Sequence, residues 1–453
     1  MKHTATALAV LFMASGCTTY NKYSRPDSVT ADGLYGDGVE VTDTVSIAAV
    51  PWRDFFTDPM LRDLIDTGLA NNTDLRIAAL RVTKAEATLS SAKLAYLPGV
   101  SLSPQGGISS WAAEKGTGTY SLGLSADWEL DIAGKLTNQK RGAAASLQEQ
   151  RHYMRAVSTQ LTATIANSYY WLMALDEQLS VSRKSLDAWD EIIRTLEARK
   201  SVGEAHGASV AQARASRLEV ENTVVSLAHQ IRVQENSLCT LLGWTPRKIE
   251  RGTLSAQAFP EAVSVGVPLR MLENRPDVRQ AEYALQAAFY ATNVSRAAFY
   301  PSLTLSGTIG WTNNSGAAVV NPGNWLMNAI GSLTQPLFNR GRNVAGLKIA
   351  RANQEEALVV FRQKLLEAGA EVNDALSQWQ SATRRLSVSG QRISALEEAV
   401  RSTRLLMTYS ESSTYLEVLT AQQALLSAQL ARTQETFDKI QGIIKLYHAL
   451  GGG

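Results

Sequence analysis

Residues 74–98 read DLRIAALRVTKAEATLSSAKLAYLP, and residues 277–301 read DVRQAEYALQAAFYATNVSRAAFYP. The two stretches align without a gap at an offset of 203 residues, and both begin with aspartate and end with proline. The similarity continues past the proline, because SLS at 101–103 faces TLS at 304–306. The alternative is chance similarity between two alanine-rich helices, against which the shared prolines and the similar strands after them argue. The repeat therefore predicts a structural unit that is present twice in order to bury its surface.

A β-hairpin is predicted after each copy of the repeat, because proline cannot continue a helix. Residues 120–130 alternate, with apolar side chains on one face and small or polar ones on the other. Residues 302–311 alternate in the same way. This period of two is typical of a membrane-spanning strand, although a half-buried soluble strand shows it as well. We expect hairpins over about 100–131 and about 302–337.

A very long helical hairpin is predicted to follow each β-hairpin, over about 135–242 and about 341–450. Leu172, Leu179, Leu186 and Ile193 recur every seven residues, and the positions 207 residues later keep the same register. A helix over 135–200 would be roughly 100 Å long, which is too long for one compact globule. We therefore expect these helices to pack along others as coiled coils.

The remaining segments complete a domain organisation of five parts. Residues 1–16 have a basic start, a short apolar run and small residues, as in a secretory signal peptide. The small residues run directly into Cys17, as in a bacterial lipoprotein, with an ordinary signal peptide as the alternative. Residues 17–50 are then a lipidated arm, 51–242 the first repeat, 243–268 a linker and 269–453 the second repeat.

The composition gives no reason to expect an enzyme or a nucleic-acid partner. The formal charge of the 453 residues is +2, and none of the five histidines forms a metal or catalytic motif with a neighbour. We expect no cofactor and no metal site.

The two hairpins supply four strands, and four strands cannot close a barrel. In lipid, an open sheet edge leaves backbone groups without hydrogen bonds, so closure is required. If the hairpins enter a membrane, two or more chains must combine their strands.

Five stretches together resemble one known family, and they follow its order along the chain. They are PWRDFFTDPMLRDLIDTGLANNTDLRIA (51–78), SADWELDIAGK (125–135), PLRMLENRPDVRQAE (268–282), LTQPLFNRGR (333–342) and TYLEVLTAQQALLSAQL (414–430). The family is that of the TolC-like outer membrane efflux proteins, specifically the NodT-type lipoproteins of resistance-nodulation-division efflux systems.

The resemblance implies a mixed α and β membrane protein of the bacterial outer membrane. Three protomers would give a 12-stranded β-barrel and a helical α-barrel that spans much of the periplasm, with the linker at 243–268 in an equatorial collar. The implied function is to export small molecules such as drugs, detergents or metals. The implied partners are two further protomers, outer membrane lipid, a periplasmic adaptor and an inner-membrane resistance-nodulation-division pump. A secretion duct for polypeptide or polysaccharide, or a coiled-coil scaffold without a channel, are the alternatives.

The resemblance also implies that the periplasmic turns form the gate and the adaptor-contacting tip. The first turn contains Val202 and keeps the family's usual glycine at Gly203, whereas the second has Ser412 where glycine is common. Tyr409 matches the family's tyrosine, Glu417 its first acidic position, and Thr420 replaces the second. A three-fold ring of Glu417 would attract cations. Alternatively, Glu417 is an ordinary solvated residue beside Arg404 or Arg401.

Overall fold

The computed structural model describes residues 22–26, 50–109, 117–257, 275–312, 324–409 and 415–453. The chain forms two compact units, and each unit takes segments from both repeats. The first, here called the sheet unit, comprises Met1–Thr30, Ala79–Tyr153 and Arg279–Lys364. The second, here called the helical unit, comprises Ala31–Ala78, Met154–Val278 and Leu365–Gly453.

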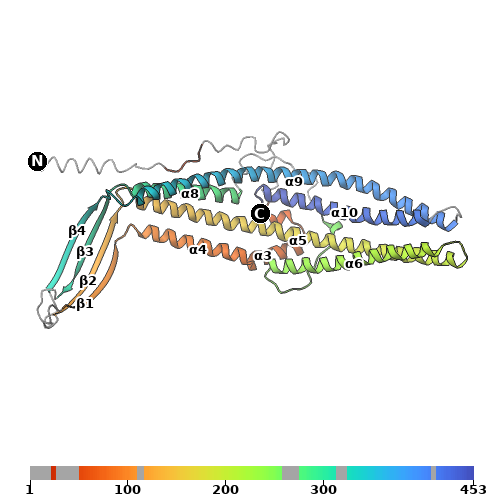
Figure 1. Ribbon diagram of the computed structural model, residues 1–453, viewed down its shortest axis with the longest axis horizontal. Coiled ribbons are helices and arrows are strands. Elements are labelled where there is room, and N and C mark those ends of the chain that lie inside the picture. The colour runs from red at the N-terminus through yellow and green to blue at the C-terminus, as the bar shows by residue number, and fades with distance from the viewer. Residues whose placement is uncertain (1–21, 27–49, 110–116, 258–274, 313–323, 410–414) are drawn as a thin grey trace. The chain divides into compact units, whose positions relative to one another are not determined.

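The sheet unit contains both predicted hairpins in one antiparallel sheet. The strands are β1 (Gly99–Ser109), β2 (Thr117–Leu130), β3 (Ser302–Thr312) and β4 (Asn324–Thr334), in the order β1-β2-β3-β4 (Figure 1). The pairing of β2 with β3 joins the two repeats, and local patterning does not predict it.

The two faces of this sheet differ in polarity. One row of paired residues across the four strands is apolar: Leu102, Leu124, Ile309 and Met327. The adjacent row is polar: Ser101, Ser125, Thr308 and Asn328. All four apolar side chains are exposed in the single chain. The sheet therefore presents an apolar surface that its own chain leaves uncovered.

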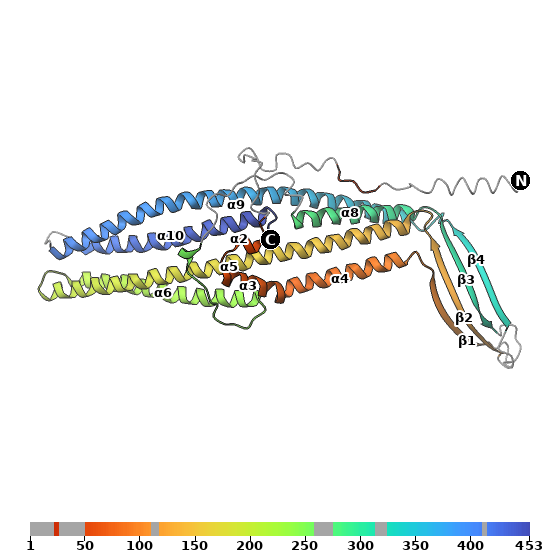
Figure 2. The same cartoon turned by 180° about the vertical axis from the view of Figure 1, so that it is seen from behind.

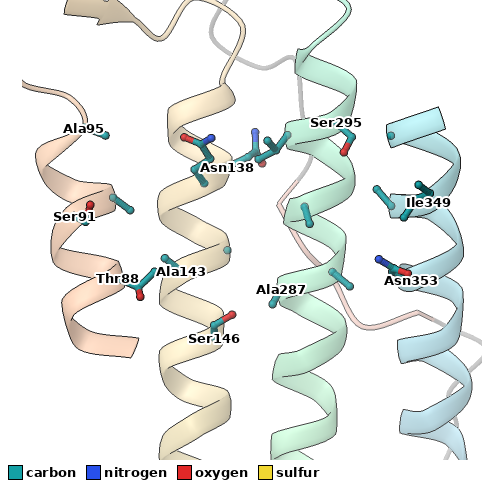
Figure 3. A pocket seen from close by; sticks show the side chains of 18 of the residues that line it. Thr88, Ser91, Ala95, Asn138, Ala143, Ser146, Ala287, Ser295, Ile349 and Asn353 are labelled. Atoms are coloured by element: carbon teal, nitrogen blue, oxygen red, sulfur yellow. The ribbon is translucent and has the colours of Figure 1, made fainter. Parts of the chain in front are cut away.

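Four helices supply the rest of the sheet unit. They are the later part of α4 (Thr73–Leu94), the first part of α5 (Lys135–Ser201), most of α8 (Pro276–Ala297) and the first part of α9 (Arg342–Tyr409). They lie side by side (Figure 3) and line a cavity of about 1190 Å³, mostly with alanine, serine and glycine. Two buried contacts tie them together. Asn293 donates to Asn138 at 3.3 Å, and Thr292 donates to the Ala350 carbonyl at 3.1 Å.

The helical unit contains the remaining parts of the two long helical hairpins. Helix α5 is followed by α6 (Gly207–Leu241) and α9 by α10 (Tyr415–Ala449), and within each pair the helices run side by side (Figure 2). Short elements α2 (Trp52–Phe55), α3 (Pro59–Asn71) and η3 (Leu254–Ala256) complete it. The predicted heptad positions Leu172 and Ile193 are buried, as are Leu175, Trp189 and Leu196 between them. The 3.5-residue period was therefore a correct guide to the packed face.

Three local features are not given by the sequence patterns. Helix α2 is one of them. Helix α4 is capped by Asn72, whose side-chain oxygen accepts from two backbone N–H groups of the first turn. Helix α8 begins at Pro276, where a fixed φ suits the first helical position and no N–H is lost.

Candidate functional site

The end of the first helical hairpin is an exposed turn held by a glycine cap. Gly203 has φ +84°, its N–H donates to the Lys200 carbonyl, and the Glu204 N–H donates to the Arg199 carbonyl. This pair of bonds is a Schellman motif, which satisfies the free carbonyls at the end of α5. Val202 beside it is exposed. The predicted tip residues Val202 and Gly203 thus form an ordered turn whose side-chain surface is open.

A buried core lies behind this turn and reaches across to the second hairpin. It joins residues of α5, α6 and α10: Trp189, Ile192, Ile193, Leu196, Val210, Ala213, Val220, Val418, Leu419 and Leu426. Val418 and Leu419 come directly after Glu417, and both are buried. The start of α10 is therefore fixed by its apolar side, which leaves its polar side chains outward.

Glu417 and Thr420 are both exposed on α10, and Glu417 lies in the first turn of that helix. A carboxylate is favourable there because the helix dipole and free N–H groups are positive. Arg404 pairs with Glu191 of α5 at 3.1 Å, and Arg401 pairs with Glu398 at 3.4 Å. Each arginine suggested as a partner of Glu417 thus has another carboxylate beside it.

The structure describes only part of the remaining predicted residues near the second turn. Tyr409 is the last residue of α9, and its side chain lies outside the described part, as does Ser412. Cys17 also lies outside the described residues. Their predicted roles stay predictions.

The junction of sheet and helix accounts for the SADWELDIAGK stretch (125–135). Trp128 donates from its ring nitrogen to the Tyr96 carbonyl at 2.9 Å, and Glu129 pairs with Lys135 at 2.9 Å. Asp131 accepts from two backbone N–H groups at the start of α5, each at 2.8 Å. In the second repeat, Gln335 replaces the tryptophan and donates to the Phe299 carbonyl at 3.0 Å. The repeat therefore preserves this junction through different donors.

The C-terminal ends of α6 and α10, far from the turns, have the same capping structure in both repeats. Gly243 after α6 and Gly451 after α10 both have positive φ, and each forms the two bonds of a Schellman motif. Asn72 donates to the Leu241 carbonyl at 3.0 Å in the first joint. In the second joint, Arg275 donates to the Ala449 carbonyl at 2.9 Å. The two joints thus differ in charge.

Arg275 makes the second joint an ionic one. Its side chain is 3% exposed, pairs with Asp277 at 2.7 Å and with Glu371 of α9 at 2.6 Å. Burial by itself would raise the pKa of Asp277, but the Arg275 guanidinium outweighs it and holds that pKa below its usual range. Burial and the charge of Arg275 lower the pKa of nearby His448. No sequence pattern singles out Arg275 as a buried ionic residue, although arginine-proline-aspartate marks the start of the second copy.

A second buried arginine attaches the linker after α6. Arg251 pairs with Asp176 of α5 at 2.5 Å and with Glu235 of α6 at 2.6 Å. Its side chain is 6% exposed. Near the same linker segment, Tyr169 donates to Asp58, which caps α3 and lies close to Gly252. The segments around Asp58 and Arg251 are thus fixed to α5 and α6 by buried polar contacts.

None of the described helices is long and apolar enough to cross a membrane. Within the described ranges, no group of three or more histidine, cysteine, aspartate or glutamate side chains could hold a metal ion. Cys239 is buried, as expected for a small apolar side chain.

Comparison with known proteins gives matches along almost the whole chain. The profile of a family described as "Outer membrane efflux protein" matches residues 64–244 and 267–452. The probable outer membrane lipoprotein SilC of Salmonella typhimurium is 29% identical, with 99% of this chain and 98% of SilC covered. The pyoverdine export outer membrane protein OpmQ of Pseudomonas putida is 30% identical over 89% of this chain and 88% of its own length.

Solved structures agree with these matches. A crystal structure of CusC superposes with a TM-score of 0.87 at 27% identity and covers 96% of this chain and 100% of CusC. The open state of the MtrE outer membrane channel of Neisseria gonorrhoeae gives 0.85 at 25% identity, with 96% and 98% covered.

Proposed function

Because the chain belongs to the outer membrane efflux protein family, we propose that three copies form the outer membrane duct of a tripartite efflux pump. Efflux is the function of the chain, and the outer membrane is its location. The observation that carries the proposal is the family match to both repeats, which includes both β-hairpins and both helical hairpins.

The sheet is suited to line a channel through lipid. Its apolar rows would face the acyl chains, and its serine- and threonine-rich rows would face a water-filled lumen. The four-stranded sheet of one chain has open edges at β1 and β4. Joining the β1 edge of one protomer to the β4 edge of the next would close twelve strands and satisfy the backbone groups.

The ends of the two helical hairpins would carry the gate and the contact with a periplasmic adaptor, which links the duct to an inner-membrane pump. Val202 and Gly203 support a contact role because their turn is exposed. The residues in or beside the second turn would lie nearer the axis: Tyr409, Ser412, Glu417 and Thr420. Three-fold symmetry would bring three copies of Glu417 together.

Cys17 would be the lipid-bearing first residue of the mature protein, with residues 1–16 removed. Acyl chains add to the anchoring that a barrel supplies. Radioactive palmitate should label the wild-type protein and not Cys17→Ala. A wild-type protein that takes up no label would remove Cys17 from the lipoprotein class.

The substrates are proposed to be small molecules or ions, chosen by the pump. Relatives of equal identity, 29%, are named for cation efflux (CusC of Escherichia coli) and for toluene efflux (TtgC of Pseudomonas putida). Identity to the duct therefore does not separate metals from organic compounds. The same relatives favour efflux over the secretion of polypeptide or polysaccharide.

A pair of adjacent substitutions tests the function. In a strain that lacks the gene, the wild-type chain should restore resistance to silver or copper ions, or to organic toxicants, when its pump is present. Leu124→Lys should abolish that resistance, because lysine on a lipid-facing strand costs about 2–4 kcal/mol near the midplane. Ser125→Lys, on the polar face, should retain it. Equal resistance in both variants, or none with the wild-type chain, would contradict an efflux duct.

A further inference from the structure

A short part of the N-terminal arm is packed on helix α8 within the sheet unit. Residues 22–26 are described, and two of their side chains contact α8. Arg25 forms two hydrogen bonds with Glu282, at 2.8 and 3.0 Å. The Tyr23 ring meets the Phe289 ring edge-on, with centroids 5.8 Å apart. Arg25 and Tyr23 are two residues apart, and their partners are two helical turns apart on α8.

The carboxylate of Glu282, which pairs with Arg25, is buried and needs a charged partner. Glu282 is 8% exposed, and Arg279 also donates to it at 3.0 Å. Burial alone would raise the pKa of Glu282, but hydrogen bonds from Arg25 and Arg279 outweigh it and lower the pKa. A buried carboxylate that loses such a partner keeps its desolvation cost without compensation. The Arg25 contact is therefore unlike an exposed ion pair, whose contribution is small.

The internal repeat provides a control for this contact. Glu282 and Phe289 of α8 correspond to Ala79 and Glu86 of α4, at the offset of 203 that aligns the two copies. Arg279 has its equivalent in Arg76, so the two copies share this arginine but differ at both side chains that meet the arm. The helix scaffold does not need a buried glutamate and a phenylalanine at these positions, since the first copy folds without them.

Chain length connects this contact to the site of lipidation. Cys17 precedes Tyr23 by six residues, which span at most about 20 Å when fully extended. Phe289 lies eight residues before Ala297, the end of α8, which corresponds to about 12 Å of helix. From its contact on α8, the arm is thus long enough to carry residue 17 past the end of α8, where the chain enters β3.

We propose that residues 22–26 are a strap that docks the arm on α8 and keeps the lipidated Cys17 within about 20 Å of Phe289, beside the strands. The purpose of the strap rests on the proposed lipidation, whereas the docking rests on the contacts of Tyr23 and Arg25. The partner of the strap is α8 of the same chain, as the contacts of Arg25 and Tyr23 indicate.

Trypsin gives a direct measurement of the docking in the full-length oligomer. Lys22 is the single cleavable trypsin site between Cys17 and Arg53, because the Arg25–Pro26 bond resists the enzyme. Cleavage after Lys22 requires the strap to leave α8. Intact-mass spectrometry can follow the loss of the segment that ends at Lys22.

Removing a side chain from either side of the contact between the strap and α8 should accelerate cleavage at Lys22. We expect at least a tenfold faster rate for Arg25→Ala, Glu282→Gln and Phe289→Ala. The double variant Arg25→Ala/Glu282→Gln should be at most about twofold faster than the faster single variant, because the two residues act on one contact. Exchanging the two charges is not informative, because an arginine at 282 would face Arg279. Tyr23 is left unchanged because it follows the cleaved bond.

The matched control is Glu86→Ala. It removes an ion pair with Arg151 from the corresponding position of the first copy and leaves the strap intact, so its cleavage rate should equal that of the wild-type protein. Two results would overturn the docking. One is a wild-type cleavage rate in all three single variants, and the other is an equal acceleration of cleavage in the control. Palmitate labelling separates the two proposals. Protection of Lys22 without label would overturn lipidation and the purpose of the strap, while label without protection would overturn the strap alone.

Discussion

At the scale of single residues, Glu417 offers a direct test of the gate. It is exposed in the first turn of α10, while Val418 and Leu419 beside it are buried, so its backbone position is fixed by packing. In a planar bilayer, Glu417→Ala should weaken the block by multivalent cations added from the periplasmic side.

The control is Glu219→Ala, which removes an exposed acidic residue from α6 of the first hairpin and should leave the block unchanged. Unchanged conductance and unchanged block in Glu417→Ala would show that Glu417 is outside the gate. It would then be the ordinary solvated residue of the alternative interpretation.

Asn72 and Arg275 occupy corresponding positions at the C-terminal ends of α6 and α10. Asn72 is neutral and Arg275 is charged, so we expect their replacement to lower stability by different amounts. Arg275→Ala would leave the Asp277 carboxylate without its buried partner, at a cost of about 3–5 kcal/mol. Asn72→Ala should cost about 1–2 kcal/mol, because it removes a neutral cap. Thermal unfolding followed by circular dichroism should therefore show a larger fall in midpoint for Arg275→Ala. A fall no larger than that of Asn72→Ala would contradict the ionic joint.

At the scale of elements, the pairing of β2 with β3 depends on a missing side chain. A Cβ at Gly310 would lie 2.3 Å from the Leu122 carbonyl oxygen and 2.6 Å from the Gly123 Cα, both backbone atoms. Gly310→Ala should therefore push the two strands apart and destabilise the folded sheet by about 1–3 kcal/mol. The amount of folded protein in the outer membrane should fall as a result.

Gly307 of the same strand is the control, because a Cβ there meets its nearest atom at 3.5 Å, an ordinary contact. Gly307→Ala should be inserted at wild-type levels, as measured by immunoblots of outer membrane fractions. Equal insertion of both alanine variants would show that the sheet can shift to accept a side chain at 310.

At the scale of the whole molecule, the open sheet predicts an oligomer. One chain contributes four strands, lipid does not tolerate free edges, and about eight strands are the smallest barrel. We expect native mass spectrometry in detergent to give a mass of three chains. A monomer or dimer that conducts ions in a bilayer would contradict the proposed architecture.

Much of this protein could be predicted from local patterns, because period-two strands, heptad helices and glycine or proline boundaries are properties of short segments. The alternation at 120–130 is found in β2, and the heptad residues Leu172 and Ile193 are buried in α5. Each copy of the repeat is followed by two strands and two long helices. Exposure of the predicted tip residue Val202 also follows from its place in a turn between two helices.

The contacts that distinguish the two halves were decided by the tertiary structure alone. Arg275 meets Glu371 across 96 residues, Arg25 meets Glu282 across 257, and β2 pairs with β3 across the middle of the chain. No periodicity encodes such partners, since each is chosen by which side chains the folded helices and strands bring together in a buried place. The sequence by itself determined that the chain has two like halves, and only the fold made one joint ionic and placed the arm on α8.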